Sequence, residues 1–216
     1  MFSKWFKSKD TEETTASGPE ILGLRNKASF ELDSLLLRLT NNDLVTNNIA
    51  PTQIILASGL VELDDVYIAR FYTDDEAFLQ VVIQGELKDE NVVDVKLFHY
   101  YKTIDIGSDS DWNRLLNQEI GCAEYSLEGH TYHRVWESTS DYHKPVHMHE
   151  QTFDEDGDTS ETDQFTMLFE REYATDSFES VFLSAEESVD EHDNISRCLV
   201  ISTGITLSAS QITIHG

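Results

Sequence analysis

The feature of this chain that most constrains its fold is an internal echo, in which residues 30–108 are followed by similar residues, in the same order, in 125–210. Such self-similarity indicates a repeated structural unit. The same pattern also fits two unrelated antiparallel β regions, because alternation and Thr/Asp turns are common to all of them. Both interpretations stay open at this stage. The matched pairs include Phe30 with Tyr125, Arg38 with Arg134, Arg70 with Arg171, Tyr72 with Tyr173, Phe78 with Phe178 and Val81 with Val181.

Most of the chain after residue 30 has the composition of β-strands. Segments rich in β-branched and aromatic residues are bounded by Asp, Asn, Gly or Ser turns. Short connections between them predict antiparallel hairpins, and the turn at 154–157 places Gly157 where a positive φ is needed. The predicted strands are 30–39, 52–63, 66–72, 77–83, 92–102, 131–137, 146–153, 164–171, 178–185 and 195–206.

One segment between the two halves is predicted to be helical. Ser108 or Ser110 can cap it, and Gly121 can end it. Its apolar face consists of Trp112, Leu115, Leu116 and Ile120.

The fold class that these patterns favour is α+β, predominantly antiparallel β, with two structurally similar tandem halves joined by a helix. The predicted organisation is a flexible basic and aromatic peptide with its linker in 1–19, a β-rich half in 20–108, a connecting helix in 109–121 and a second β-rich half in 122–216.

The charge of the chain argues against nucleic-acid binding. It has 41 acidic and 15 basic residues, a net charge of −26, so it repels a phosphate backbone. Basic proteins, polyamines and metal cations remain candidate partners. The alternative is that the acidic surface serves solubility or reflects a salty habitat and has no specific partner.

The cysteines and the absence of targeting signals predict a cytoplasmic protein. No segment of the sequence approaches the roughly 20 apolar residues of a membrane span, and no secretory signal is recognisable. Cys122 and Cys198 each lie in an apolar stretch, which predicts buried, reduced thiols in a reducing compartment.

Residues 1–9 have a character opposite to that of the acidic remainder. Aromatic residues at i, i+3, i+4 spacing are interleaved with lysines. Such a peptide favours weak peripheral membrane contact or docking in the groove of a protein partner, although a frayed terminus explains it equally well. The candidate contact residues are Phe2, Lys4, Trp5, Phe6 and Lys7.

Five of the eight histidines lie close together in the sequence, at positions 130, 133, 143, 147 and 149. His147 and His149 alternate, so on a strand both imidazoles leave the same face, where Glu150 or a histidine of 130–133 would complete a shell for Zn, Ni or Cu. The alternative is a His-rich, solvated hairpin. The candidate metal ligands are His130, His133, His147 and His149. No recognisable catalytic motif is present, so the sequence names no catalytic residue and no other cofactor, and leaves open whether the protein is an enzyme.

Several segments resemble the YjfK-like family of uncharacterised bacterial proteins. They are PTQIILASG (51–59), RFYTDDEAFLQVV (70–82), EGHTYHRVW (128–136), SETDQFTML (160–168) and RCLVISTGITLS (197–208). The similarity extends over nearly the whole chain. The family is a domain of unknown function, so the resemblance implies no activity, cofactor or catalytic residue. Its members tend to be encoded beside a coiled-coil protein similar to phage-shock protein A, which implies a cytoplasmic accessory role in an envelope-associated system.

Together these observations favour an interaction protein that contacts a protein partner through its acidic surface or its N-terminal peptide. The alternative is a metal-binding protein or metal-dependent enzyme that uses the histidines of 130–149.

Overall fold

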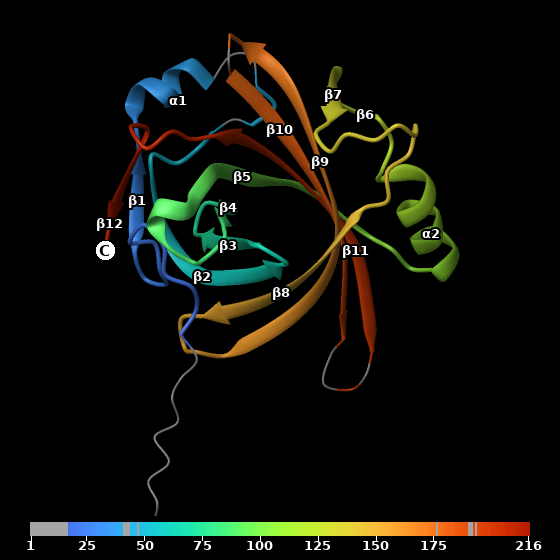
Figure 1. The fold of residues 1–216 in the computed structure, drawn as a ribbon, viewed down its shortest axis with the longest axis horizontal. Helices are drawn as coiled ribbons and strands as arrows, with labels where there is room; N and C mark the ends of the chain where they lie inside the picture. Colours follow the sequence, from blue (N-terminus) through green and yellow to red (C-terminus); the bar gives the residue numbers. More distant parts are fainter. Residues whose placement is uncertain (1–16, 41–43, 47, 176, 190–191, 193) are drawn as a thin grey trace, which may run out of the picture.

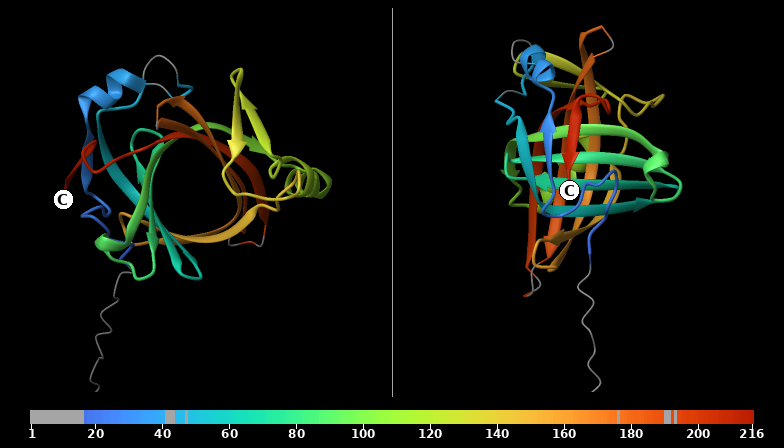
Figure 2. Two further views of the ribbon diagram at one scale, coloured as in Figure 1. Left: turned by 45° about the horizontal axis from the view of Figure 1, so that its top comes forward. Right: turned by 90° about the vertical axis from the view of Figure 1, so that its left-hand side faces the viewer.

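The computed structural model describes residues 17–40, 44–46, 48–175, 177–189, 192 and 194–216. Within these residues eight antiparallel strands close into a barrel, which appears as a ring in Figure 2 (left). Around the ring they follow the order β2–β3–β4–β5–β11–β10–β9–β8. Their bounds are β2 (Thr52–Leu63), β3 (Val66–Thr73), β4 (Ala77–Gln84), β5 (Val92–Asp105), β8 (Val146–Asp154), β9 (Thr159–Ala174), β10 (Ser177–Val189) and β11 (Ile195–Thr206).

Each half of the chain contributes one four-stranded meander to the barrel. The first is β2–β3–β4–β5 and the second is β8–β9–β10–β11, each with its strands in sequence order. Two antiparallel seams join them, one between β5 and β11 and one between β8 and β2. The predominantly antiparallel β character is therefore confirmed, and both halves share one closed sheet.

The residue pairs that suggested duplication do not all occupy equivalent places. Arg70 lies inside the barrel, whereas Arg171 lies on the outer face of β9 and pairs with Glu179. Phe78 is 3% exposed and Phe178 is 41% exposed, so these two matched residues do not occupy equivalent core positions. The superposition of the two halves as whole units stays a prediction.

Short elements cover the outside of the barrel on two sides, as Figure 1 shows. One side carries the edge strands, the first helix and a single 3-10 turn, and the other carries the connecting helix with its hairpin. The first group is β1 (Ser29–Leu32), α1 (Ser34–Thr40), η1 (Asp89–Asn91) and β12 (Ile212–His215). The second group is α2 (Asp109–Arg114), η2 (Leu115–Glu119), β6 (Glu124–Leu127) and β7 (His130–Arg134).

The apolar cores lie mainly between the barrel wall and these covers. Phe30 and Leu24 pack with Phe71 and Leu79 on the outer face of the first meander. Trp112 and its neighbours pack on the outer face of the second. Apolar residues therefore stand on both faces of many strands, which is why β4 reads as a nearly continuous apolar run.

Segment 30–39 was predicted to be a strand, and most of that prediction is wrong. The strand ends at Leu32 and a helix begins at Ser34. Asp33 caps the helix, since its Oδ1 accepts hydrogen bonds from the amides of Leu35 and Leu36 at 2.8 and 3.1 Å. The consecutive leucines therefore follow helical periodicity, with Leu36 buried and Leu35 exposed.

The connecting helix is confirmed at its predicted place and continues from α2 into the π-helical turn η2. Ser108 is the N-cap, and its Oγ accepts a hydrogen bond from the Asp111 amide at 3.1 Å. None of the helices in the described ranges is long and apolar enough to cross a membrane. The turn at 154–157 is also confirmed, with Gly157 at φ 89°.

The two cysteines are free, as predicted, but each is half-buried rather than fully buried. Cys198 lies on β11 with Glu186 and Asp105 as its cross-strand neighbours. Burial first, and then the two carboxylates, raise the pKa of this thiol to about 11.

We therefore expect Cys198 to alkylate slowly near neutral pH. In a Cys122→Ser variant the rate with iodoacetamide should keep rising with pH toward about 11, because the thiolate is the nucleophile. The same variant in urea should level off near the ordinary thiol pKa of roughly 8.5. Identical pH profiles for the folded and unfolded protein would contradict the assignment.

Candidate functional site in the barrel interior

A buried ion pair crosses the centre of the barrel. Arg70 of β3 and Glu150 of β8 are 2% and 1% exposed, and Arg70 Nη1 donates to Glu150 Oε2 at 2.6 Å. Side chains alternate along a strand, so even-numbered residues of β3 and β8 point into the barrel. The pair therefore joins the first meander to the second from within.

Neutral polar groups complete the hydrogen bonding of the ion pair. Arg70 Nη1 also donates to Gln164 Oε1 at 2.7 Å, and its Nε donates to Gln80 Oε1 at 3.0 Å. Glu150 accepts from Gln164 Nε2 at 2.7 Å and from the Tyr72 hydroxyl at 2.5 Å. Buried charges are tolerated when they are paired and hydrogen-bonded, as Arg70 and Glu150 are here.

The network fixes the protonation states of its members. Burial opposes the positive charge of Arg70, but the neighbouring Glu150 carboxylate outweighs it and raises the pKa of Arg70. Burial, reinforced by Glu150, raises the pKa of Tyr72 well above its ordinary value. At neutral pH Arg70 is thus a fixed cation and Tyr72 a fixed hydrogen-bond donor.

Two glycines make room for the interior side chains. A Cβ on Gly59 of β2 would lie 1.9 Å from Glu150 Oε1, and a Cβ on Gly204 of β11 would lie 2.5 Å from Phe98 Cδ1. Glycine within a strand commonly marks such a close approach.

Three aromatic rings pack beside the ion pair. The ring centroid of Phe98 lies 5.2 Å from that of Phe78 and 5.5 Å from that of Phe182. The Arg70 guanidinium carbon lies 5.3 Å from the centroid of Phe182, within the range of a cation–π contact. The rings and the polar network together block the middle of the barrel.

On one side of this block the barrel contains a cavity of about 530 Å³. Side chains of seven strands contribute to its walls, which makes it a part of the barrel interior. Gln80 and Phe182 form part of both the block and the cavity lining. The apolar lining residues are Leu63, Val66, Ile68, Val82, Trp136, Val146, Met148, Leu168 and Phe182.

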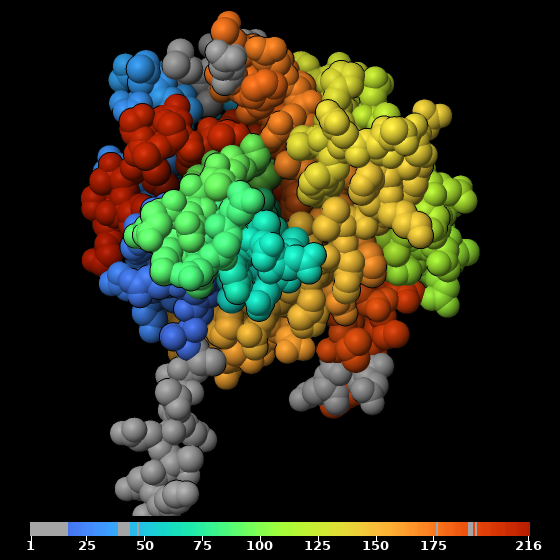
Figure 3. All heavy atoms as spheres, viewed as in Figure 1, coloured from blue at the N-terminus to red at the C-terminus, as the bar shows by residue number. Residues whose placement is uncertain are grey.

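The mouth of this cavity lies among three segments of the barrel. They are the β2–β3 turn, the beginning of β5 and the segment that leads into β8. In Figure 3 these segments, coloured cyan, green and yellow, come together on the front of the molecule.

On the other side of the block the interior is narrower and polar. A cavity of about 20 Å³ is lined there by Tyr100, Glu186, Ser184 and Ser202 among others. The hydroxyl of Ser202 is buried and has no hydrogen-bond partner among the described residues. Burial raises the pKa of Glu186. The two ends of the barrel therefore differ in size and polarity.

The histidines that suggested a metal site are divided between two places. His147 and His149 do leave the same face of β8, and both contact Asp163 Oδ1, at 2.8 and 3.2 Å. His130 and His133 lie on β7, where His133 pairs with Glu124 at 3.5 Å. Strands β7 and β8 contact different parts of β9, with His133 opposite Glu170 and His147 opposite Phe165. Those positions are roughly 17 Å apart along a strand.

This arrangement gives the metal hypothesis no geometric support. Among the described residues, no group of three or more His, Cys, Asp or Glu side chains could hold a metal ion. Glu150, proposed as a further ligand, points into the barrel because it has the opposite parity to His147 and His149. The candidate contact residues Phe2, Lys4, Trp5, Phe6 and Lys7 lie outside the described residues.

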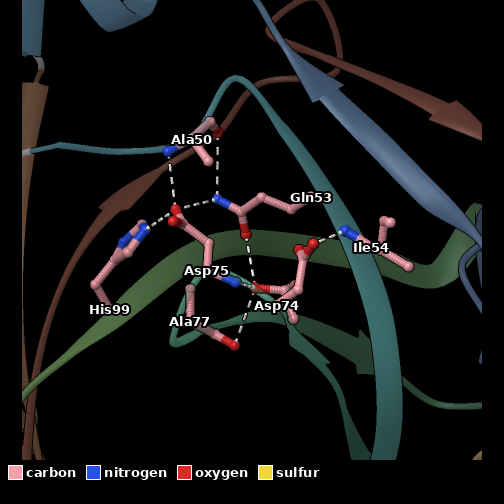
Figure 4. Close-up of polar contacts among 8 residues, drawn as sticks. Ala50, Gln53, Ile54, Asp74, Asp75, Ala77 and His99 are labelled. Carbon is pink, nitrogen blue, oxygen red and sulfur yellow. Dashed lines mark hydrogen bonds and ion pairs between the residues drawn. The ribbon is translucent and has the colours of Figure 1, made fainter.

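A second polar cluster, shown in Figure 4, surrounds the β3–β4 turn. Asp75 Oδ2 accepts from the Ala50 amide at 2.8 Å and from Gln53 Nε2 at 3.1 Å, and it lies 3.1 Å from His99 Nε2. Burial lowers the pKa of His99, although Asp75 opposes the shift. In a catalytic triad the second imidazole nitrogen bonds the nucleophile. His99 Nδ1 has no partner within the described part of the chain, so no nucleophile is hydrogen-bonded to this imidazole there.

The interior network has signals in the sequence, although it matches no recognised motif. Arg70 and Gln80 are single polar residues within apolar strand segments, at IARFY and FLQVV. Gly59 stands inside a predicted strand without a turn beside it. Arg70, Gln80 and Gly59 each interrupt an apolar strand pattern. The first two supply polar side chains to the barrel interior, and Gly59 leaves room for the Glu150 side chain.

Comparison with known proteins confirms the resemblance found in the sequence. Residues 1–213 match the family model described as protein of unknown function (DUF2491). The uncharacterized protein YjfK of Escherichia coli (strain K12) is 28% identical over 194 residues, which cover 88% of this chain and 87% of that protein. No solved structure matches the chain.

We expect the ion pair to be critical for stability. Arg70→Met leaves the Glu150 carboxylate buried without its cation, which should lower the free energy of unfolding by about 3–5 kcal/mol. An Arg70→Met, Glu150→Met double variant should recover much of that loss, since no buried charge remains. Urea denaturation measures both.

The control for this prediction is Arg114→Met. Arg114 pairs with Asp111 and Glu119 on the surface and is 55% exposed, so its loss should lower the free energy of unfolding far less than the loss of Arg70. A similar small loss for Arg70→Met would show that the buried pair does not hold the barrel together.

Proposed function

The chain belongs to the DUF2491 family of proteins of unknown function, and we propose that its barrel is a receptor for a small, mostly apolar molecule. The observation that carries this proposal is the cavity of about 530 Å³ inside the barrel. Sites for small molecules are usually preformed concave pockets of about 300–1,000 Å³ with mostly apolar walls and a few polar groups. This cavity fits that description.

The aromatic rings and the polar network close the inner end of the cavity, so the cavity is a pocket with one mouth rather than a channel. We refer to this pocket as the cup. Gln80 and Phe182 line its inner end, and Gln80 is held by the Arg70 side chain. A molecule that enters at the mouth therefore stops against a floor fixed by the ion pair. The polar end of the barrel, with about 20 Å³, is too small to take more than about one water molecule.

The walls suit an alkyl chain. The cavity is lined by Val66, Ile68 and Val82 of the first meander and by Met148 and Leu168 of the second. Burial of each methylene group contributes about 0.8 kcal/mol, so affinity should rise about fourfold with each carbon that the cup accommodates.

We expect n-alkyl alcohols to displace N-phenyl-1-naphthylamine from the protein with affinities that rise from octanol to dodecanol. Val66→Phe should weaken both probe and alcohol binding about tenfold or more, because the larger ring fills the half-buried mouth. The control is Val189→Phe, an equal change at a residue that is 59% exposed and distant from the cavity. Fluorescence titration measures each affinity.

The outcome that would end this proposal is a failure of every alcohol to bind, or equal binding by Val66→Phe and the unaltered protein. Thermal unfolding of both variants checks that the barrel remains folded.

A second candidate function is that of an accessory protein in an envelope-associated system, as the family resemblance implied. The sequence observation that favours it is the basic and aromatic segment 1–9, attached to a chain of net charge −26. In this proposal Phe2, Trp5 and Phe6 enter a membrane interface or a partner groove while Lys4 and Lys7 meet acidic groups. A cytoplasmic location is part of the proposal and is consistent with two free cysteines.

For this candidate we expect weak binding to anionic vesicles at low salt and less at physiological salt. Each lysine near such a surface contributes about 1 kcal/mol, whereas the acidic body is repelled. A Phe2→Ala, Trp5→Ala, Phe6→Ala variant should lose most of the binding in co-sedimentation. Equal sedimentation of both proteins would refute the membrane contact.

A further inference from the structure

We propose that the molecule bound in the barrel mouth is a single-chain amphipath with a cationic head group, such as a long-chain amine or quaternary ammonium ion. This inference rests on the proposed function and names its ligand class. The alkyl chain fills the cup, and the head group stays at the rim.

The charges around the mouth carry this inference. Asp64 and Asp65 of the β2–β3 turn and Asp94 of β5 line the same cavity as the apolar wall residues. Asp64 and Asp65 are exposed, and Asp94 is half-buried. Among the described residues that line the cavity there is no Lys, Arg or His. A head group at this rim therefore meets three carboxylates and no cation of the lining.

Two buried cations near the lining residues, Lys96 and Arg70, already have carboxylate partners. Lys96 of β5 has its Nζ 2.9 Å from Glu170 and 3.7 Å from Asp94, and it also donates to Thr206 Oγ1 at 2.6 Å. Arg70 is held by Glu150 beneath the floor. A fatty acid carboxylate would have to displace one of these partners, and its own charge would be repelled by the rim.

The partial burial of the Asp94 carboxyl at the rim also favours a cationic head group. Burial raises the pKa of Asp94, Lys96 opposes the rise and Glu170 reinforces it. A cation beside Asp94 would stabilise its ionised form. Trp136 also lines the mouth and provides an aromatic ring, the side chain that attracts quaternary ammonium ions most strongly.

The charge of the whole chain acts in the same direction. A net charge of −26 attracts cations toward the surface and slows the approach of anions. The three rim carboxylates act at short range, whereas the net charge of the chain acts at long range and is screened more strongly by salt. Mutation of the rim therefore removes the first contribution and leaves most of the second.

The test compares three ligands with the same dodecyl chain, namely dodecyltrimethylammonium, dodecanol and dodecanoate, each below the concentration at which it aggregates. Isothermal titration of the full-length protein should give the order of affinity ammonium, alcohol, carboxylate. We expect about a tenfold step between the cation and the alcohol, which corresponds to one charge interaction near a protein surface.

The rim is tested with an Asp64→Asn, Asp65→Asn, Asp94→Asn variant. Its ratio of affinities for dodecyltrimethylammonium and dodecanol should fall toward one, which is the loss of its preference for the cation. The matched control is Glu155→Gln, Asp156→Asn, Asp158→Asn, which removes the same charge from the exposed β8–β9 turn at the other end of the barrel. The control should keep the preference at physiological salt.

Each outcome separates this inference from the proposed function. Equal binding of all three ligands, or a preference for dodecanoate, would overturn the cationic head group and leave the receptor intact. Failure of all three to bind would remove the receptor itself. An equal loss of preference in both triple variants would assign selectivity to the overall charge and overturn the role of the rim.

Discussion

The ion pair between Arg70 and Glu150 is the constraint on which the barrel interior depends. Two charges that are almost fully excluded from water require partners in a fixed geometry, and Gln80, Gln164 and Tyr72 provide them from three strands. Because the pair spans the two meanders, it specifies which strands face each other as well as how the interior is filled. It also supports the floor that separates a wide apolar cup from a narrow polar end.

The charged interior is tolerated because the apolar cores lie elsewhere. Outer faces of the first meander are covered by β1, α1 and β12, and those of the second by α2, β6 and β7. The hydrophobic contribution to folding therefore comes largely from the outside of the barrel wall. This leaves the inside free to hold an ion pair, a stack of aromatic rings and a cavity.

The sequence predicted the strands of this protein far better than their closure. Alternation and turn residues located β2 to β5 and β8 to β11 to within a few residues, and Ser108 located the connecting helix, because these signals are local. The partners of a barrel strand are set by long-range pairing, so nothing near Gly59 or Glu150 revealed that β2 and β8 are neighbours. The four-residue strand β12 was missed for the same reason, since its partner is β1, whereas β6 pairs locally with β7 and was also missed. The metal hypothesis grouped histidines by sequence distance, whereas β7 and β8 contact β9 at different places.

The difference between the two ends of the barrel gives the interior a direction. At the wide end, aliphatic residues surround a space that Asp64, Asp65 and Asp94 border. At the narrow end, hydroxyl groups and one carboxyl group, that of Glu186, surround a much smaller space. An amphipathic molecule can satisfy both parts of the wide end only with its chain inward, since an inverted molecule would bury its head group against Phe182 and expose its chain to water. Arg70 and Lys96 are already paired with carboxylates, so an anionic head group that entered the cavity would find no unpaired cation among them. The floor, walls and rim of the cavity therefore favour the same ligand, an alkyl chain with a cationic head group. This selectivity depends on Arg70 and Lys96, whose charges are neutralised by carboxylates of the fold itself.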